Sequence, residues 1–493
     1  MALELVALVK HDCPVCDQLL PALDAAAAAG APLRILSQSS PEETAAQAAR
    51  LHLHATPAVD GDLEVSARYD PDAVPTLLLL DGTDERDRVE GLQRDRIVAL
   101  AAEAGATLAL DGLPALRPGC ASKTREPEIA ARLAAARARA QGRIRSRVLT
   151  VGELEDPIEA LHDRGLTDGL PVVPPTPERV VAMLEHTSRD PQDVVGAVPP
   201  YGAPATIEKI AINAVMAGCP DDVLPIVLAA VEAALQEPFA MHGLLATTHP
   251  AGPAIVVSGP LADEVGMASA GNVLGQGNRP NLTIGRALQL VIRNVGGGRP
   301  GVEDRAAHGH AGKVGTCFAE RLEGMPWEPL AQARGVPPGE TGVTLMALEA
   351  PRLIIDQLAR TPDELVASFA TALESVGHPR TRLGLDALLL VGPEHGRVFA
   401  QAGWDRERLQ SALFERTSRA AGELVRDADG FAEGIEAKWV TDPAARIPKF
   451  AGPDRIQIAY AGGDAGLFSM VFGSWVAGEI GSEPVSVSVE PWR

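Results

Sequence analysis

The chain has 493 residues, with 44 lysines and arginines against 65 aspartates and glutamates, and so a formal net charge of −21. At roughly 150 residues per domain it has room for about three domains. Its 46% hydrophobic and 22% charged residues can bury sizeable cores, which excludes a disordered polyanion. Binding a phosphate backbone needs a basic footprint, so the acidic balance argues against nucleic acid and anionic membranes as partners.

Neither a membrane span nor a secretory signal is expected. The sequence has no run of about 18 uninterrupted apolar residues, and its short N-terminal apolar stretch carries Glu4 where a signal needs basic residues. We therefore expect a cytoplasmic protein. Five cysteines are too few for a disulfide framework, and their odd number leaves at least one thiol free or transiently paired.

The first 110 residues alternate apolar runs with helical stretches, at the size of one small α/β domain. Strands are expected at 5–9, 33–36, 76–80 and 88–91, and helices at 17–29, 42–51 and 95–104.

Two cysteines lie where the first strand passes into the first helix, in Cys13-Pro14-Val15-Cys16. The first sulfur would lie near a helix N-terminus, where backbone N–H groups and the helix dipole favour the thiolate. The second lies one turn further on and can resolve a mixed disulfide. Alternatively, the pair is a dithiol that has lost its redox function, or half of a zinc site, in a structural domain.

Val74-Pro75-Thr76, just before a buried strand, is typical of a cis-proline turn beside such a dithiol. With this order of elements, residues 1–108 resemble a thioredoxin-like domain. The resemblance implies that Cys13 attacks, Cys16 resolves and Pro75 faces them. Asp12 and Pro14-Val15 depart from the thioredoxin pattern Trp-Cys-Gly-Pro-Cys, so neither the substrate nor the direction of electron flow follows from it.

Residues 111–150 are expected to form a connector, turn-rich at first and then helical. It carries Cys120 in a tight turn between Arg117 and Lys123, and neighbouring cations lower the pKa of a thiol. Cys120 could be a third redox partner of the dithiol, a nucleophile offered to the second domain, or a plain linker residue.

Residues 151–493 are expected to form one large α/β domain. Helices are predicted near 207–217, 223–235, 284–295 and 362–376, the first between an N-cap at Thr206 and a closing Gly218. Apolar runs at 254–258, 387–391 and 456–460 each meet glycine at once, which suggests a sheet that binds its ligand at the carboxyl ends of strands. The first two runs could belong to two similar, duplicated halves.

A loop rich in glycine and asparagine leads into the predicted helix at 284. Such a loop can aim N–H groups at an anion, so we expect a carboxylate or phosphate of a small substrate here, unless this is simply a long loop. The substrate-binding candidates are Gly275, Gly277, Asn278, Arg279 and Lys313.

Histidines, a cysteine and a glutamate gather in the same region. They could hold a divalent transition metal or perform covalent chemistry, although bonds from the histidines to a Gly-rich backbone are the alternative. Cys317 and Glu320 are three apart, so on a helix both could face one pocket. The candidate metal ligands are His242, His249, His308 and His310.

Residues 150–493 also resemble an uncharacterised bacterial family associated with small proteins that bear a Sec/Cys-Gly-Ser-Cys motif. The resemblance implies no activity, only thiol or selenol chemistry nearby. It rests on Asp168-Gly169, Pro174-Pro175, Asn213, His249-Pro250, Gly296-Gly-Gly-Arg299 and His308-Gly-His310.

The sequence favours a thiol-dependent oxidoreductase. The dithiol would relay electrons to Cys120 or Cys317, which would act on a small anionic substrate of the large domain. The alternatives are a metal- or thiol-assisted lyase or hydrolase that detoxifies a soft metal or organometal, and a non-catalytic redox adaptor. No cofactor is certain. A thiol or selenol partner protein is expected, and the chain could form a homo-oligomer.

Overall fold

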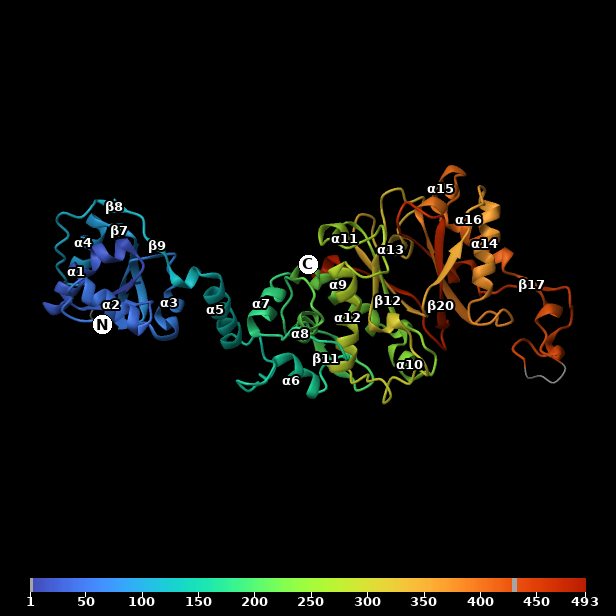
Figure 1. The fold of residues 1–493 in the computed structure, drawn as a ribbon, viewed down its shortest axis with the longest axis horizontal. Coiled ribbons are helices and arrows are strands. Elements are labelled where there is room, and N and C mark those ends of the chain that lie inside the picture. The colour runs from blue at the N-terminus through green and yellow to red at the C-terminus, as the bar shows by residue number, and fades with distance from the viewer. Residues whose placement is uncertain (1–2, 428–431) are drawn as a thin grey trace. The chain divides into compact units, whose positions relative to one another are not determined.

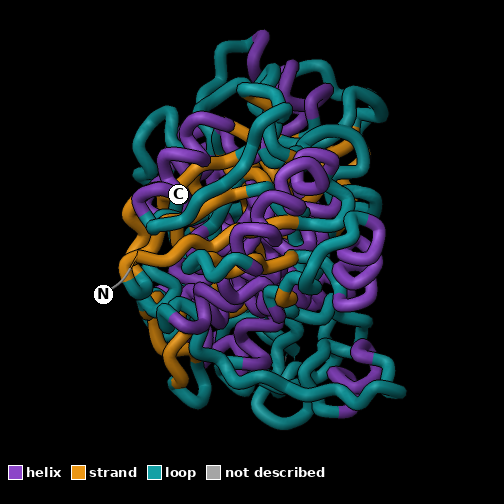
Figure 2. The backbone as a smooth tube through the Cα atoms, turned by 90° about the vertical axis from the view of Figure 1, so that its left-hand side faces the viewer, coloured by secondary structure: helices purple, strands orange, loops and turns teal. Residues whose placement is uncertain are grey.

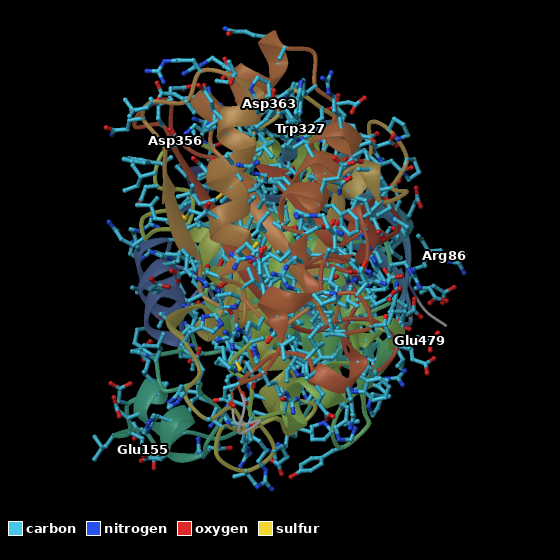
Figure 3. All side chains as sticks on the ribbon, turned by 90° about the vertical axis from the view of Figure 1, so that its right-hand side faces the viewer. Arg86, Glu155, Trp327, Asp356, Asp363 and Glu479 are labelled. Carbon is cyan, nitrogen blue, oxygen red and sulfur yellow. The ribbon has the colours of Figure 1, made fainter. Side chains whose placement is uncertain are left out.

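The computed structural model describes residues 3–427 and 432–493. The chain divides into two compact units, the first ending at Ala140 and the second beginning at Gln141 (Figure 1). Long loops join the helices and strands (Figure 2), and charged side chains such as Arg86, Glu155 and Glu479 extend from the surface (Figure 3).

The first unit is built on a five-stranded sheet in the order β3-β2-β1-β5-β6, a thioredoxin-like arrangement. The central strand β1 runs parallel to β2 and antiparallel to β5, and its residues 5–9 are buried. The strands are β1 (Leu3–Val9), β2 (Leu33–Ser37), β3 (Ala58–Val59), β5 (Thr76–Asp81) and β6 (Asp84–Glu90). The helices are α1 (Pro14–Ala28), α2 (Pro41–Arg50), α3 (Glu64–Tyr69) and α4 (Arg94–Glu103).

Residues 111–140, expected to be part of a connector, fold onto the first unit. Two short antiparallel pairs hold them there: β8 (Leu116–Arg117) on β7 (Leu92–Gln93), and β9 (Cys120–Ala121) on β4 (Ala73–Val74). Helix α5 (Pro127–Ala140) follows. The sequence did not reveal this pairing because two-residue strands carry almost no periodicity.

The second unit contains an eight-stranded mixed sheet whose main path is β13-β12-β14-β20-β16-β19. In each half the outer two strands are parallel, and the inner strand is antiparallel to its neighbour. The halves meet where Leu348 pairs with Ser474. This repetition agrees with two similar halves. The path strands are β12 (Gly252–Ser258), β13 (Thr316–Ala319), β14 (Gly342–Leu348), β16 (Leu385–Val391), β19 (Ile456–Tyr460) and β20 (Phe468–Val476), and β15 (Arg352–Ile355) and β21 (Val485–Ser488) pair beside them.

Helices cover the strands of the second unit from two sides (Figure 1). Alternate residues of β12 point into different cores: Ile255 packs with α8, α9 and α12, whereas Val256 packs against strands of the other half. Leu389 of β16 packs with α14, α15 and α16. These helices are α8 (Ile207–Ala217), α9 (Leu224–Leu235), α12 (Arg279–Asn294), α14 (Pro362–Glu374), α15 (Pro393–Gln401) and α16 (Arg406–Arg416). Shorter helices are α6 (Pro157–Asp163), α7 (Pro177–Leu184), α10 (Met241–Ala246), α11 (Pro260–Glu264) and α13 (Leu330–Ala333), and β10 (Val194–Val198) pairs with β11 (Ala203–Thr206).

Within the described ranges, no single helix is long and apolar enough to cross a membrane. One bent pair, Asp221–Leu235 with Glu237–Ala246, meets the length and composition criteria together. Its apolar residues belong to the buried core of the second unit.

Candidate functional site: three thiols in the first unit

Cys13 caps the N-terminus of α1. Its backbone is extended, Pro14 begins the helix, and the Cys16 backbone N–H donates to Cys13 Sγ at 3.2 Å. A free N–H at a helix start seeks such an acceptor, so the Cys-Pro-Val-Cys spacing itself places the second cysteine against the first. Both thiols are fully buried.

The Val74–Pro75 peptide bond is cis, as the sequence suggested. Cys13 Sγ lies 3.3 Å from the Val74 carbonyl oxygen. Pro75 therefore follows directly on a residue that touches the first thiol.

Cys120 is the third thiol of this site. In the β4–β9 pair it lies opposite Val74, the residue that Cys13 contacts. Its half-buried side chain packs against the apolar cluster that contains Cys13 and Cys16. The sequence indicated Cys120 as a candidate redox partner of the dithiol, but it did not indicate that Cys120 lies beside Cys13.

The three thiols have different acidities. A hydrogen bond from Cys16, helped by one from Cys120, lowers the pKa of Cys13 to about 6 against the opposing effect of burial. Burial and then the Cys13 sulfur raise the pKa of Cys16, and the same two causes raise that of Cys120. Near neutral pH, Cys13 is therefore the thiol that is mainly deprotonated, and the thiolate is the nucleophilic form of a cysteine.

The segment that carries Cys120 is tightly anchored. Gln38 Nε2 donates to Ser122 Oγ at 2.9 Å, and Gln38 Oε1 accepts from the Lys123 backbone N–H at 2.9 Å. The Ser122 N–H donates to the Asp72 carbonyl oxygen at 3.1 Å. Sequence reasoning missed Gln38 as a positioning residue. No local pattern around it indicates a hydrogen bond to a residue 84 positions further along the chain.

The other two cysteines lie in the core of the second unit. Burial raises the pKa of Cys219 to about 12 and that of Cys317 further. Both side chains are at most 5% exposed. Neither has the exposure of a reactive thiol.

The expectation that Cys317 and Glu320 share a helical face is wrong. Cys317 lies on strand β13, where residues three apart point to opposite sides, and Glu320 directly follows the strand. Glu320 is buried and accepts hydrogen bonds from Ser258 Oγ and the Leu330 backbone N–H, both at 2.6 Å. Its contacts join the end of β12 to the start of α13.

The four histidines do not form a metal site. His249 Nδ1 accepts the Ala251 N–H at 3.2 Å, and its Nε2 lies 3.2 Å from a Glu349 carboxylate oxygen. His310 Nδ1 accepts the Gly312 N–H at 3.1 Å, and its Nε2 lies 3.3 Å from the Leu348 carbonyl oxygen. With both ring nitrogens engaged, neither ring has a lone pair for a metal. His242 is the second residue of α10, and His308 lies in the loop before His310. Across residues 3–427 and 432–493, no three His, Cys, Asp or Glu side chains gather as a metal site would require.

The predicted anion loop is divided among structural roles. Asn278 caps α12 by accepting the Asn281 N–H at 3.0 Å, and Arg279 donates to the Gly218 carbonyl oxygen at 2.7 Å. Lys313 is paired with Asp304 at 2.9 Å. Gly275 lines a cavity of about 260 Å³ at the carboxyl ends of β16 and β19, whereas Gly277 does not. The structure therefore does not gather these five residues around one ligand.

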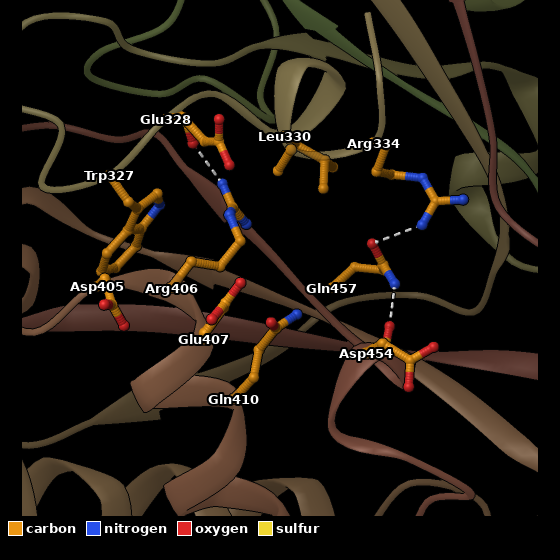
Figure 4. A pocket seen from close by; sticks show the side chains of 11 residues that line it. Trp327, Glu328, Leu330, Arg334, Asp405, Arg406, Glu407, Gln410, Asp454 and Gln457 are labelled. Carbon is orange, nitrogen blue, oxygen red and sulfur yellow. Dashed lines mark hydrogen bonds between the residues drawn. The ribbon is translucent and has the colours of Figure 1, made fainter.

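A second cavity, of about 460 Å³, lies beside α13 and α16 (Figure 4). Arg406 lies over the Trp327 ring and donates to the Glu328 carbonyl oxygen at 2.6 Å. Arg334 donates to Gln457 Oε1 at 3.2 Å. Both guanidinium groups are engaged with the protein, and the cavity contains none of the predicted site residues.

No family model and no curated protein matches the chain. Among solved structures it is similar to a secreted disulfide oxidoreductase of Mycobacterium tuberculosis homologous to E. coli DsbE, at 17% identity over 20% of this chain and 81% of that one, with a TM-score of 0.18. StoA from Bacillus subtilis gives 14% identity, the same coverages and a TM-score of 0.18. A hypothetical protein from Sinorhizobium meliloti 1021 gives 19% identity over 29% of this chain and 70% of that one, with a TM-score of 0.16.

Proposed function

We propose that the chain is a thiol–disulfide oxidoreductase in which the Cys13–Cys16 dithiol supplies electrons to Cys120. The observation that carries this proposal is the position of Cys13. Cys13 caps a helix, its sulfur accepts a hydrogen bond from the Cys16 backbone N–H, and its pKa is lowered to about 6. A thiolate beside a second thiol one helical turn away is the arrangement that exchanges disulfides.

Cys120 is favoured over Cys317 as the receiver. Cys120 packs against the dithiol cluster within the same unit, whereas Cys317 lies 5% exposed in the core of the other. A disulfide requires the two Cα atoms to approach within about 7 Å, and only Cys120 lies on a strand paired with a residue that touches Cys13.

The same proposal includes a small anionic substrate for the second unit. Covalent joining of two modules gives each an effective concentration of roughly millimolar at the other. A reduced thiol carried by the first unit would then serve a small anionic substrate held by the second. A thiol or selenol partner protein is part of the same proposal.

Intact-mass thiol mapping of the full chain tests the proposal. Reduced protein is treated with mild oxidant, and elemental analysis is made on the same sample. We expect a reversible Cys13–Cys16 disulfide on metal-free protein, which dithiothreitol reopens. A dithiol inert to oxidation, with a stoichiometric transition metal bound, would contradict the proposal.

A further inference from the structure

The most exposed of the three thiols is not the most acidic one. Cys13 and Cys16 are fully buried, whereas Cys120 is only half-buried. Strand β9 lies beside Cys13 along the edge of β4. An incoming disulfide therefore meets the Cys120 sulfur before it reaches Cys13.

We infer that Cys120 is the thiol that attacks an exogenous disulfide, and that Cys13 then attacks Cys120 rather than the exogenous disulfide itself. This inference rests on the proposed function, and it names the step that precedes the dithiol. The exogenous reactant is an organic disulfide, RS–SR.

The cover over Cys13 is built into the fold. A side-chain carbon at Gly119 would lie 2.7 Å from the Val74 carbonyl oxygen, and one at Gly91 would lie 2.7 Å from the Gly119 nitrogen. Both positions therefore need glycine for β9 to approach β4. The bonds of Gln38 and Asp72 hold the other end of the segment.

Cys120 needs a neighbouring base to become a thiolate. Burial and then the Cys13 sulfur raise its pKa, and the Val15 backbone N–H and Lys10 only partly oppose them. Cys120 is among the groups that lower the pKa of Cys13, so the Cys13 thiolate is the base that accepts the Cys120 proton. That transfer moves the negative charge to the less buried sulfur.

The exchange balances in three steps. The Cys120 thiolate attacks the disulfide RS–SR, forms a Cys120–SR bond and releases RS⁻. Cys13 gives the proton it took from Cys120 to this RS⁻, and its thiolate attacks Cys120 Sγ, forms the Cys13–Cys120 bond and releases a second RS⁻. Cys16 gives its proton to the second RS⁻ and attacks Cys13 Sγ, which yields the Cys13–Cys16 disulfide and frees the Cys120 thiolate. Two electrons pass from the dithiol to RS–SR, which becomes two thiols.

The test uses the reduced full-length chain with oxidised glutathione, followed by mass mapping over time. In Cys13→Ser, glutathione should accumulate on Cys120. In Cys16→Ser, the Cys13–Cys120 disulfide should accumulate. In Cys120→Ser, with Cys120→Ala as a second variant, the Cys13–Cys16 disulfide should form more slowly by on the order of tenfold, because exchange depends on access. Cys219→Ala is the matched control and should leave the rate unchanged.

Two outcomes separate this inference from the function on which it rests. If Cys120→Ser forms the Cys13–Cys16 disulfide as fast as the natural chain, Cys120 is not the thiol that meets the disulfide and the inference is overturned. If the natural chain forms no Cys13–Cys16 disulfide, the proposed function fails as well. Circular dichroism of each variant shows whether the fold is kept.

Discussion

Cys13 combines full burial with a lowered pKa, because hydrogen bonds outweigh the cost of placing a charge away from water. Its acidity should be visible directly. Thiolate absorbance in the ultraviolet, measured as the difference between the natural chain and Cys13→Ser, should rise as the pH increases through about 6. Below that pH the thiol is protonated and exchange should slow. A midpoint near the ordinary 9.0 would contradict the site's electrostatics.

The Cys120 hydrogen bond makes a separate contribution to that acidity. In Cys120→Ala the pKa of Cys13 should lie above 6 but below 9.0, because the Cys16 contacts remain. The same ultraviolet titration measures the shift. An unchanged midpoint would show that Cys120 does not bond to Cys13 in solution.

Sequence reasoning succeeded at this scale where chemistry is local. Cys13, Cys16 and Pro75 lie near one another because a strand end, a helix start and a cis turn place them there. It failed for Glu320, because the spacing was interpreted with a helical period and the segment follows a strand. It also could not foresee that the ring nitrogens of His249 and His310 bond to nearby groups.

At the scale of elements, the β4–β9 pair decides which thiols meet. Gly119→Ala places a methyl group 2.7 Å from the Val74 carbonyl oxygen and 2.9 Å from Ala73 Cβ. Overpacking of this kind costs roughly 1–3 kcal/mol, and it should push β9 away from Cys13. In a Cys16→Ser background, the yield of Cys13–Cys120 disulfide should then fall.

Gly61→Ala is the matched control for that substitution, since a side-chain carbon there meets nothing within 4 Å. It should leave both the urea midpoint and the disulfide yield unchanged. Equal yields from both variants would show that close packing of β9 does not bring Cys120 to Cys13.

Elements with strong local signals were predictable. Thr206 caps α8 and Gly218 ends it in a left-handed conformation, as the residues indicated. The sequence also indicated β12, β16 and β19, each of which ends at or near a glycine. The β9 pairing was not predictable, because it joins residues far apart in sequence, such as Val74 and Cys120.

Across the whole molecule, the cysteines outside the Cys13–Cys16 pair should fall into two classes. Cys219 and Cys317 belong to the core of the second unit, so they should resist iodoacetamide until that unit unfolds. Their alkylation should follow the urea transition measured by circular dichroism, whereas Cys120 should react in native buffer. Reaction of Cys317 under native conditions would restore it as a candidate receiver.

The repeated strand order of the second unit shows what one sequence conveys about large architecture. Two matching strand-then-glycine runs suggested similar halves, and the order β13-β12-β14 is indeed repeated in β19-β16-β20. The packing of the two halves through Val256 and Leu390 could not be predicted. Both strands are apolar on each face, so neither face was marked as external.

Disulfide mapping of the reduced full-length chain after limited oxidation tests the central claim most directly. The measurement compares the natural chain with Cys16→Ser by tandem mass spectrometry. The account predicts Cys13–Cys16 in the natural chain and Cys13–Cys120 in the variant, both reopened by dithiothreitol. Cys13 left free in both proteins would contradict a three-thiol exchange site.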